Sequence, residues 1–231
     1  MTNPHAAELD KFQAEADAAR AQARLHLANA REAEANADLA QLGLIKAEED
    51  ERARRHSDAH HRLYQFDGAV EASSAKACMQ QLRQWDRLDP ECDIEVIFNS
   101  PGGSVIPGMA LFDLIVRLSQ RGGGQHRITV GAQGMAASMA GILLQSGDHR
   151  WMGPEAVVLI HEISAGTVGK IGEMLDAVKL YETLCARVID IFIGRAEGKC
   201  SKAKFVKSWT RTDWWLTSAE CLKLGFVDEI R

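Results

Sequence analysis

Ser138 is the strongest candidate for chemistry in this chain of 231 residues. It lies in the small-residue segment 134–141, after a β-branched run ending at Val130 and before an apolar run starting at Ile142. A strand, a tight turn and a buried helix would place its hydroxyl beside free N–H groups at the positive end of the helix dipole. This pattern predicts a nucleophile. A serine among small residues also occurs where helices pack closely, so the segment needs partners elsewhere.

A nucleophilic serine needs an imidazole to take its proton and a carboxylate to orient that imidazole. His161 ends the apolar run 157–161, one strand after Ser138, so both can reach one edge of a sheet. Asp213 precedes two tryptophans, and we expect it to be partly buried with a hydrogen-bonded partner. Taken alone, His161 could be a satisfied core histidine, and Asp213 a turn or N-cap aspartate.

The segment Asn99–Ser104 follows an apolar strand and contains two adjacent glycines, Gly102 and Gly103. Glycines allow backbone conformations closed to other residues and let a ligand approach the main chain. A phosphate-binding turn is an alternative interpretation. However, the pattern G-x-x-x-x-G-K-[ST] is absent, and its nearest match, 194–200, is one residue too short and lacks the final hydroxyl. The sequence thus lacks an ATPase motif of its own.

Strands and helices alternate from residue 62 onward, which predicts an α/β fold with a mostly parallel sheet covered by helices. Functional residues gather at the carboxyl ends of strands in such sheets, where Gly103, Ser138 and His161 all fall. The predicted strands are 62–66, 94–98, 127–132, 156–161 and 226–229. The predicted helices are 72–88, 105–121, 137–145, 169–195, 202–209 and 217–224.

The N-terminal region differs in composition from the rest of the chain. Residues 5–56 are rich in Ala, Glu and Arg, which favour one helix of about 75 Å. Its large apolar residues hold no strict heptad, so such a helix cannot form a core alone. We therefore predict two domains: a helical arm at 1–58, coiled-coil-like or partner-binding, and a catalytic domain at 59–231. A solvated arm without a partner is the alternative.

Composition excludes several classes of protein. A net charge of −5 argues against nucleic acid as the main partner. The five cysteines are widely spaced without a C-x-x-C pair, so neither a zinc site nor a disulfide framework is indicated. Residues 1–12 lack a signal-peptide core, and no apolar run approaches the roughly 18 residues of a membrane span. We expect a cytoplasmic protein without metal, cofactor or membrane contact.

Four segments in order resemble the proteolytic subunit of the Clp protease, and together they span the chain from about residue 62 to its C-terminus. They are 98–105 with 108–110, 134–139, 160–161, and 213–220 with 224–228. The resemblance implies a ClpP/crotonase-type fold of repeated β-β-α units, with 169–195 as its long handle helix. The helical arm at 1–58 is an extension that the family lacks.

The same resemblance implies a serine endopeptidase. Ser138 would be the nucleophile, His161 the general base and acid, and Asp213 the orienting carboxylate. It also implies an oxyanion hole made by two main-chain N–H groups, and substrate bound as an extended strand.

The main-chain groups implied for these two tasks come from two short segments. The N–H groups of Gly103 and Met139 would form the oxyanion hole, and substrate would lie beside Gly102 and Gly103. Because Met139 would act through its main chain, we expect its side chain to vary freely.

Members of this family form seven-membered rings, often stacked in pairs, so the resemblance implies a homo-oligomeric ring acting on protein or peptide substrates. Thr212 stands where the family usually has an arginine used between rings. The arm replaces the family's short N-terminal segment, which docks an ATP-driven AAA+ unfoldase, and leaves the use of an unfoldase open. Relatives encoded near phage capsid genes act on scaffold or shell proteins without ATP, and a helical arm could serve that capsid-maturation role.

One of three alternatives stays open at the sequence level. The family commonly has glutamine at Met135 and Gln-Pro at Glu162 and Ile163, so an inactive scaffold working through its arm stays open. If Glu162 faced the site, its charge would favour an imidazolium at His161. Enoyl-CoA hydratases share the fold but lack this serine, histidine and aspartate set. Serine–lysine signal-peptide peptidases need a lysine near a central strand end, and none is present.

Overall fold

The structure is a computed structural model that describes residues 4–55 and 57–231. The chain divides into two compact units, residues 1–57 and 58–231. Among the described residues, no helix is long and apolar enough to cross a membrane.

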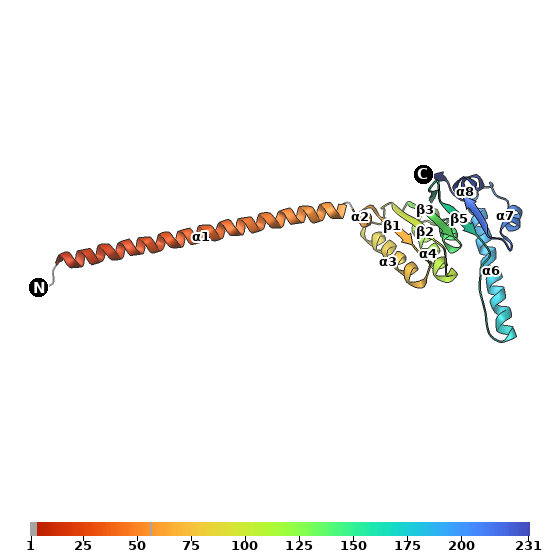
Figure 1. Ribbon diagram of the computed structural model, residues 1–231, viewed down its shortest axis with the longest axis horizontal. Coiled ribbons are helices and arrows are strands. Elements are labelled where there is room, and N and C mark those ends of the chain that lie inside the picture. Colours follow the sequence, from red (N-terminus) through yellow and green to blue (C-terminus); the bar gives the residue numbers. More distant parts are fainter. Residues whose placement is uncertain (1–3, 56) are drawn as a thin grey trace. The chain divides into compact units, whose positions relative to one another are not determined.

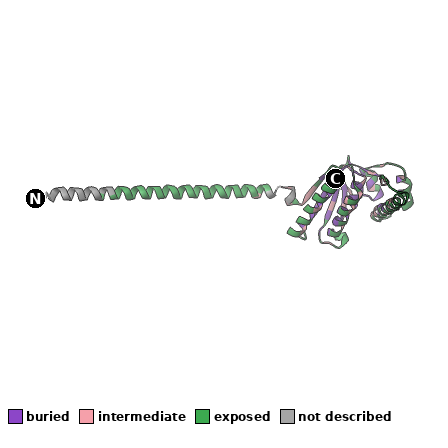
Figure 2. Ribbon diagram, turned by 90° about the horizontal axis from the view of Figure 1, so that it is seen from below, coloured by how far each residue is buried: buried purple, intermediate pink, exposed green. Residues whose placement is uncertain are grey.

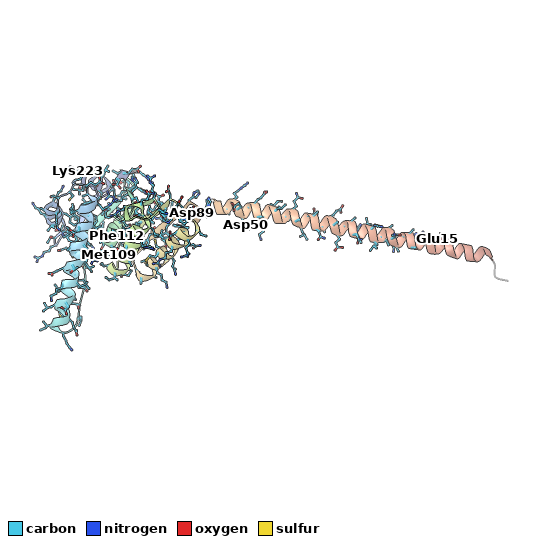
Figure 3. The ribbon with its side chains drawn as sticks, turned by 180° about the vertical axis from the view of Figure 1, so that it is seen from behind. Glu15, Asp50, Asp89, Met109, Phe112 and Lys223 are labelled. Carbon is cyan, nitrogen blue, oxygen red and sulfur yellow. The ribbon has the colours of Figure 1, made fainter. Side chains whose placement is uncertain are left out.

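The first unit is formed by one helix, α1 (Pro4–Arg55), drawn from red to orange in Figure 1. Every residue from 18 to 50 is exposed, including Leu39 and Leu44 at 66% and 68%. Figure 2 accordingly colours this stretch green, and Figure 3 shows its side chains, among them Asp50. The apolar residues are scattered around the helix rather than gathered on one face. The predicted long N-terminal helix is confirmed.

The second unit contains a seven-stranded sheet among the described residues, with neighbours in the order β1-β2-β3-β4-β7. These pairs are all parallel. The long strand β3 pairs with β4 through its first half and with β5 through its second half, and β6 then joins β5 antiparallel. The strands are β1 (Leu63–Asp67), β2 (Ile94–Ser100), β3 (Ile128–Ala137), β4 (His149–Met152), β5 (Val157–Ile160), β6 (Trp214–Thr217) and β7 (Glu229–Ile230).

Helices cover this sheet, and the mixed α/β fold predicted from the sequence is confirmed (Figure 1). Ala75, Cys78 and Leu82 recur at helical spacing on one helix and are fully buried, and Phe112 of a neighbouring helix joins the same core (Figure 3). The helices are α2 (Asp58–His61), α3 (Ala72–Leu88), α4 (Val105–Leu118), the 3-10 helix η1 (Gln120–Gly122), α5 (Met139–Leu143), α6 (Ile171–Arg195), α7 (Lys202–Trp209) and α8 (Ser218–Leu224).

The structure differs from the sequence prediction at four strands. Strand β7 begins at Glu229, the last residue of the strand predicted at 226–229. Strand β3 continues to Ala137, so the small-residue segment is mostly strand and α5 is shorter than the helix predicted there. Strand β4 has no predicted counterpart, because its Arg150 is a charged residue that tertiary contacts bury. Strand β6 was also missed. Its two tryptophans alternate between partly buried and exposed, as residues of a strand do. Asp213 beside them favoured a turn instead.

Candidate active site

Ser138 lies at the junction between β3 and α5, where it is the residue before the first helical position. Its backbone has φ 54° and ψ −119°, a region that residues with a Cβ rarely adopt. The N–H of Ser138 donates a hydrogen bond of 2.8 Å to the carbonyl of Leu159 in β5, which holds this turn against the neighbouring strand. The sequence therefore produces a sharp strand-to-helix turn with a hydroxyl at its apex.

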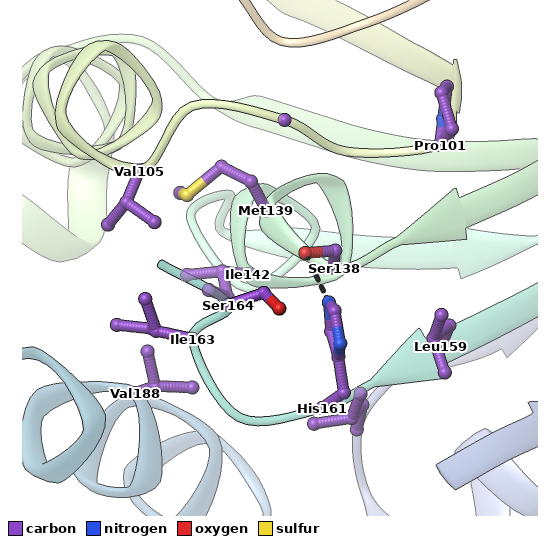
Figure 4. Close-up of a pocket in the computed structure, with 12 residues that line it drawn as sticks. Pro101, Val105, Ser138, Met139, Ile142, Leu159, His161, Ile163, Ser164 and Val188 are labelled. Carbon is purple, nitrogen blue, oxygen red and sulfur yellow. Dashed lines mark hydrogen bonds between the residues drawn. The ribbon is translucent and has the colours of Figure 1, made fainter. Parts of the chain in front are cut away.

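His161 follows the last residue of β5 and faces Ser138 across this strand end. Its Nε2 lies 2.7 Å from Ser138 Oγ, within hydrogen-bonding distance (Figure 4). The side chain of His161 is 27% exposed, so the pair lies at the edge of the fold rather than in its core. The structure thus brings together two residues that are 23 positions apart in the sequence.

Asp213 meets His161 because of the antiparallel ladder between β5 and β6. The ladder ends at the pair Ile160 and Trp214, and His161 and Asp213 are the next residues outward on each strand. Their side chains approach to 3.6 Å between Nδ1 and Oδ1. The expected burial of Asp213 was wrong, since its side chain is 68% exposed. The neighbouring tryptophans do not cover it, because Trp215 is itself 52% exposed.

The turn at Gly102 and Gly103 packs directly against the Ser138 junction. Gly102 has φ +87°, and a Cβ there would lie 2.9 Å from the amide nitrogen of Met139. Gly103 pairs with Val70, which fixes the turn. In residues 57–231, no acceptor is found for the N–H of Gly103, and Met139 begins α5, where the amide has no partner within the helix. Two free N–H groups therefore lie on segments that touch next to Ser138.

A pocket of about 210 Å³ opens beside Ser138 and His161 (Figure 4). Its wall is mostly apolar, which means that it can accept an apolar side chain next to the hydroxyl. These lining residues come from α4, α5, α6, β5 and the segment after β5, so sequence spacing alone gave no signal for them. The apolar lining consists of Val105, Met139, Ile142, Leu159, Ile160, Ile163 and Val188.

The side chain of Met139 has a packing role that the sequence interpretation missed. It is 1% exposed, and its Cγ would lie 2.3 Å from a Cβ built on Gly108 of α4. The glycine at this point of α4 leaves room for the Met139 side chain in the conformation that it adopts. The expectation that this side chain varies freely was therefore wrong.

Side chains that could bind a metal ion are dispersed among the described residues. Within them, no group of three or more histidine, cysteine or acidic side chains is close enough to hold a metal ion. The five cysteines are free thiols. Burial raises the pKa of Cys221 to about 12, so that thiol stays protonated and is a poor nucleophile.

Comparison with known proteins places most of the chain in one family. Residues 49–231 match the family model described as Clp protease. The "ATP-dependent Clp protease proteolytic subunit 2" of Tropheryma whipplei is 39% identical over 145 residues, which cover 62% of this chain and 76% of that protein. The "ATP-dependent Clp protease proteolytic subunit" of Streptococcus mutans is 31% identical over 194 residues, which cover 80% and 95%. The chain therefore belongs to the Clp protease family.

Proposed function

We propose that this protein is a serine endopeptidase that cleaves peptides or unfolded proteins through an acyl-enzyme. The 2.7 Å contact between Ser138 Oγ and His161 Nε2 is the observation that carries the proposal. In the first step, Ser138 Oγ attacks the scissile carbonyl carbon while its proton passes to His161 Nε2. His161 then gives this proton to the leaving amine, which departs and leaves an ester on Ser138.

The second half of the reaction uses the same groups in reverse. A water molecule attacks the ester carbon and gives its proton to His161, which returns one to Ser138 Oγ as the carboxylic acid leaves. The N–H groups of Gly103 and Met139 stabilise the oxyanion in both steps. Asp213 holds the imidazole of His161 with its Nδ1–H directed toward the carboxylate. Nε2 is then free to accept the proton of Ser138 Oγ.

Substrate class and assembly extend this proposal. The apolar pocket beside Ser138 favours an apolar residue immediately before the scissile bond. Substrate lies as an extended strand beside Gly102 and Gly103. We further propose that copies assemble into a heptameric ring. In that ring, α6 would provide the surface on which a second ring could stack. The exposed side chains of Leu175 and Val178 on α6 support such a contact.

Partners and location remain predictions from the sequence. The sequence resemblance implies that the arm replaces a short unfoldase-docking segment, and we propose that α1 instead has a partner-targeting role such as phage capsid maturation. Cytoplasmic location likewise rests on the sequence prediction.

The decisive experiment compares the wild type with Ser138→Ala. We expect a serine-reactive fluorophosphonate to label the wild type and not the variant, and hydrolysis of a fluorogenic peptide to fall to background. Mass measurement of both proteins should give the same assembly, which excludes misfolding as the cause. Equal labelling of both proteins would remove Ser138 as the nucleophile.

A second candidate is a catalytically inactive scaffold that binds partners through α1. Two observations favour this second candidate. Helix α1 is exposed, and the Asp213 carboxylate is solvent-exposed and lies 3.6 Å from His161 Nδ1. It predicts no labelling and no hydrolysis by the wild type in any assembly state, with partner binding lost on removal of residues 1–58. The fluorophosphonate experiment therefore separates the two candidates.

A further inference from the structure

Glu162 makes a contact that neither its position after His161 nor the proposed reaction explains. Its Oε2 accepts a hydrogen bond of 2.7 Å from the main-chain N–H of Arg211, across 49 residues of sequence. Glu162 directly follows His161, and Arg211 lies two residues before Asp213. The contact therefore joins the segment that carries the imidazole to the segment that carries the carboxylate.

The backbone at Arg211, whose N–H donates to Glu162, is strained. Arg211 has φ 54°, a left-handed conformation that costs a residue with a Cβ about 1 kcal/mol or more. Such a conformation persists only where surrounding contacts hold it. On the α7 side, the N–H of Thr212 donates to the carbonyl of Trp209 at 3.2 Å. On the opposite side, Glu162 holds the N–H of Arg211 itself, so the carboxylate supports the turn at its strained point.

The position of the Asp213 carboxylate depends on this backbone more than the position of a buried carboxylate would. Its side chain is 68% exposed, and in residues 57–231 its carboxylate makes no hydrogen bond or ion pair other than the 3.6 Å approach to His161. Within the same residues, no side-chain hydrogen bond fixes its place. Its distance from His161 is therefore set by its main chain, which the pair Ile160 and Trp214 holds on one side and the turn at Arg211 holds on the other.

From these contacts, and resting on the proposed peptidase function, we propose that Glu162 is a positioning residue. By anchoring the N–H of Arg211, it fixes the turn that carries Asp213 against His161. It acts as a hydrogen-bond acceptor for the main chain, not as a charge that acts on the imidazole.

Two substitutions at Glu162 separate the acceptor from the charge. Glu162→Gln keeps a carbonyl oxygen that can accept from the N–H of Arg211 and removes the charge, whereas Glu162→Ala removes both. If Glu162 acts through its charge alone, the two variants behave alike. If Glu162 positions the turn, Glu162→Gln keeps the activity that Glu162→Ala loses. Glu155→Ala is a matched control, because Glu155 is an exposed carboxylate near the other end of β5.

The experiment measures kcat and KM for a fluorogenic peptide with an apolar residue before the scissile bond. We expect Glu162→Ala to lower kcat about tenfold with KM changed less than about twofold, since small misplacements of a catalytic group slow the chemistry. Glu162→Gln and Glu155→Ala should keep most of the wild-type kcat. In an Asp213→Ala background, Glu162→Ala should lower kcat no further, because residues that act through one another are not additive.

Equal losses in Glu162→Gln and Glu162→Ala, or a full tenfold loss in the Asp213→Ala background, would overturn the proposal. Hydrogen–deuterium exchange of the segment 210–214 gives a readout that needs no activity. We expect faster exchange there in Glu162→Ala, and wild-type exchange in Glu162→Gln. An inactive wild type that still shows this exchange pattern would reject the peptidase function alone, whereas unchanged exchange in Glu162→Ala would reject the anchor.

Discussion

Gly102 lies against Ser138 so closely that a single methyl group added to it would lie 2.7 Å from the Cβ of Ser138. The same methyl group would lie 2.4 Å from the carbonyl oxygen of Ala137, which real Cβ atoms do not approach so closely. The glycine turn and the serine turn thus form one packed unit. Neither can change shape without moving the other.

Gly102→Ala should therefore abolish peptide hydrolysis and lower the free energy of unfolding. Gly68→Ala is the matched control, because Gly68 has a similar φ of +84° but open space around it. The control should lose about 1 kcal/mol from backbone strain alone and keep its activity. Gly102→Ala should lose at least about 2 kcal/mol more, from the added steric conflict. Denaturant unfolding and peptide hydrolysis check both variants, and similar losses in the two would contradict the close packing.

Asp213→Asn should separate orientation from stability. The amide has no charge to stabilise the imidazolium, so we expect kcat to fall by about 10²- to 10⁴-fold. The free energy of unfolding should stay within about 0.5 kcal/mol of the wild type, because the side chain is mostly exposed. Peptide hydrolysis and thermal unfolding of the same preparation measure the two effects. A kcat within twofold of the wild type would remove Asp213 from the reaction.

Met139→Ala should be destabilising although Met139 is proposed to act through its main chain. The side chain is 1% exposed and fills the space above Gly108, so its removal leaves a cavity. We expect a loss of about 2–4 kcal/mol in the free energy of unfolding. Met139→Leu conserves most of the volume and should lose less than about 1.5 kcal/mol. If alanine and leucine proved equally harmless in denaturant unfolding, the side chain would have no packing role.

Asp228 should make the stability of the second unit depend on pH. Arg150 is 1% exposed, and its main-chain N and Nε donate to Asp228 Oδ2 at 2.8 and 3.1 Å. Burial alone would raise the pKa of Asp228, but the hydrogen bonds and charge of Arg150 hold that pKa below its usual value. Because the folded pKa is depressed, this stabilisation is present above the unfolded pKa of about 3.9 and is lost as pH falls through the folded pKa.

Asp228→Asn should therefore lose about 3 kcal/mol at pH 7, because it leaves the buried guanidinium of Arg150 without its counter-charge. The difference from the wild type should shrink as pH falls below the unfolded pKa of about 3.9, because the unfolded carboxyl then takes up a proton that the folded carboxylate, with its depressed pKa, binds only at lower pH. Denaturant unfolding at several pH values measures this. Asp113→Asn, at an exposed position on α4, is the control and should change stability little at any pH. A difference that stays constant down to pH 3 would contradict the ion pair.

Local sequence pattern predicted the helices and strands in which buried residues recur at a regular spacing. Helices α3 and α7 begin and end where the sequence predicts, because their apolar residues recur at helical spacing between clear boundaries. Small residues around Ser138 and the paired glycines at 102 and 103 marked a site for main-chain approach. The order of these segments also carried the family resemblance.

Tertiary contacts decided what local pattern cannot express. Strand β4 escaped prediction because Arg150 is charged, and its burial depends on tertiary contacts such as the ion pair with Asp228. Strand β6 escaped because its hydrogen bonds are made with β5, more than 50 residues away in the sequence. The meeting of Asp213 with His161, and the anchor from Glu162 to Arg211, follow from the register of that ladder. The sequence indicated the candidate reacting side chains, whereas their distances depended on strand pairing between segments that the chain brings together only when it folds.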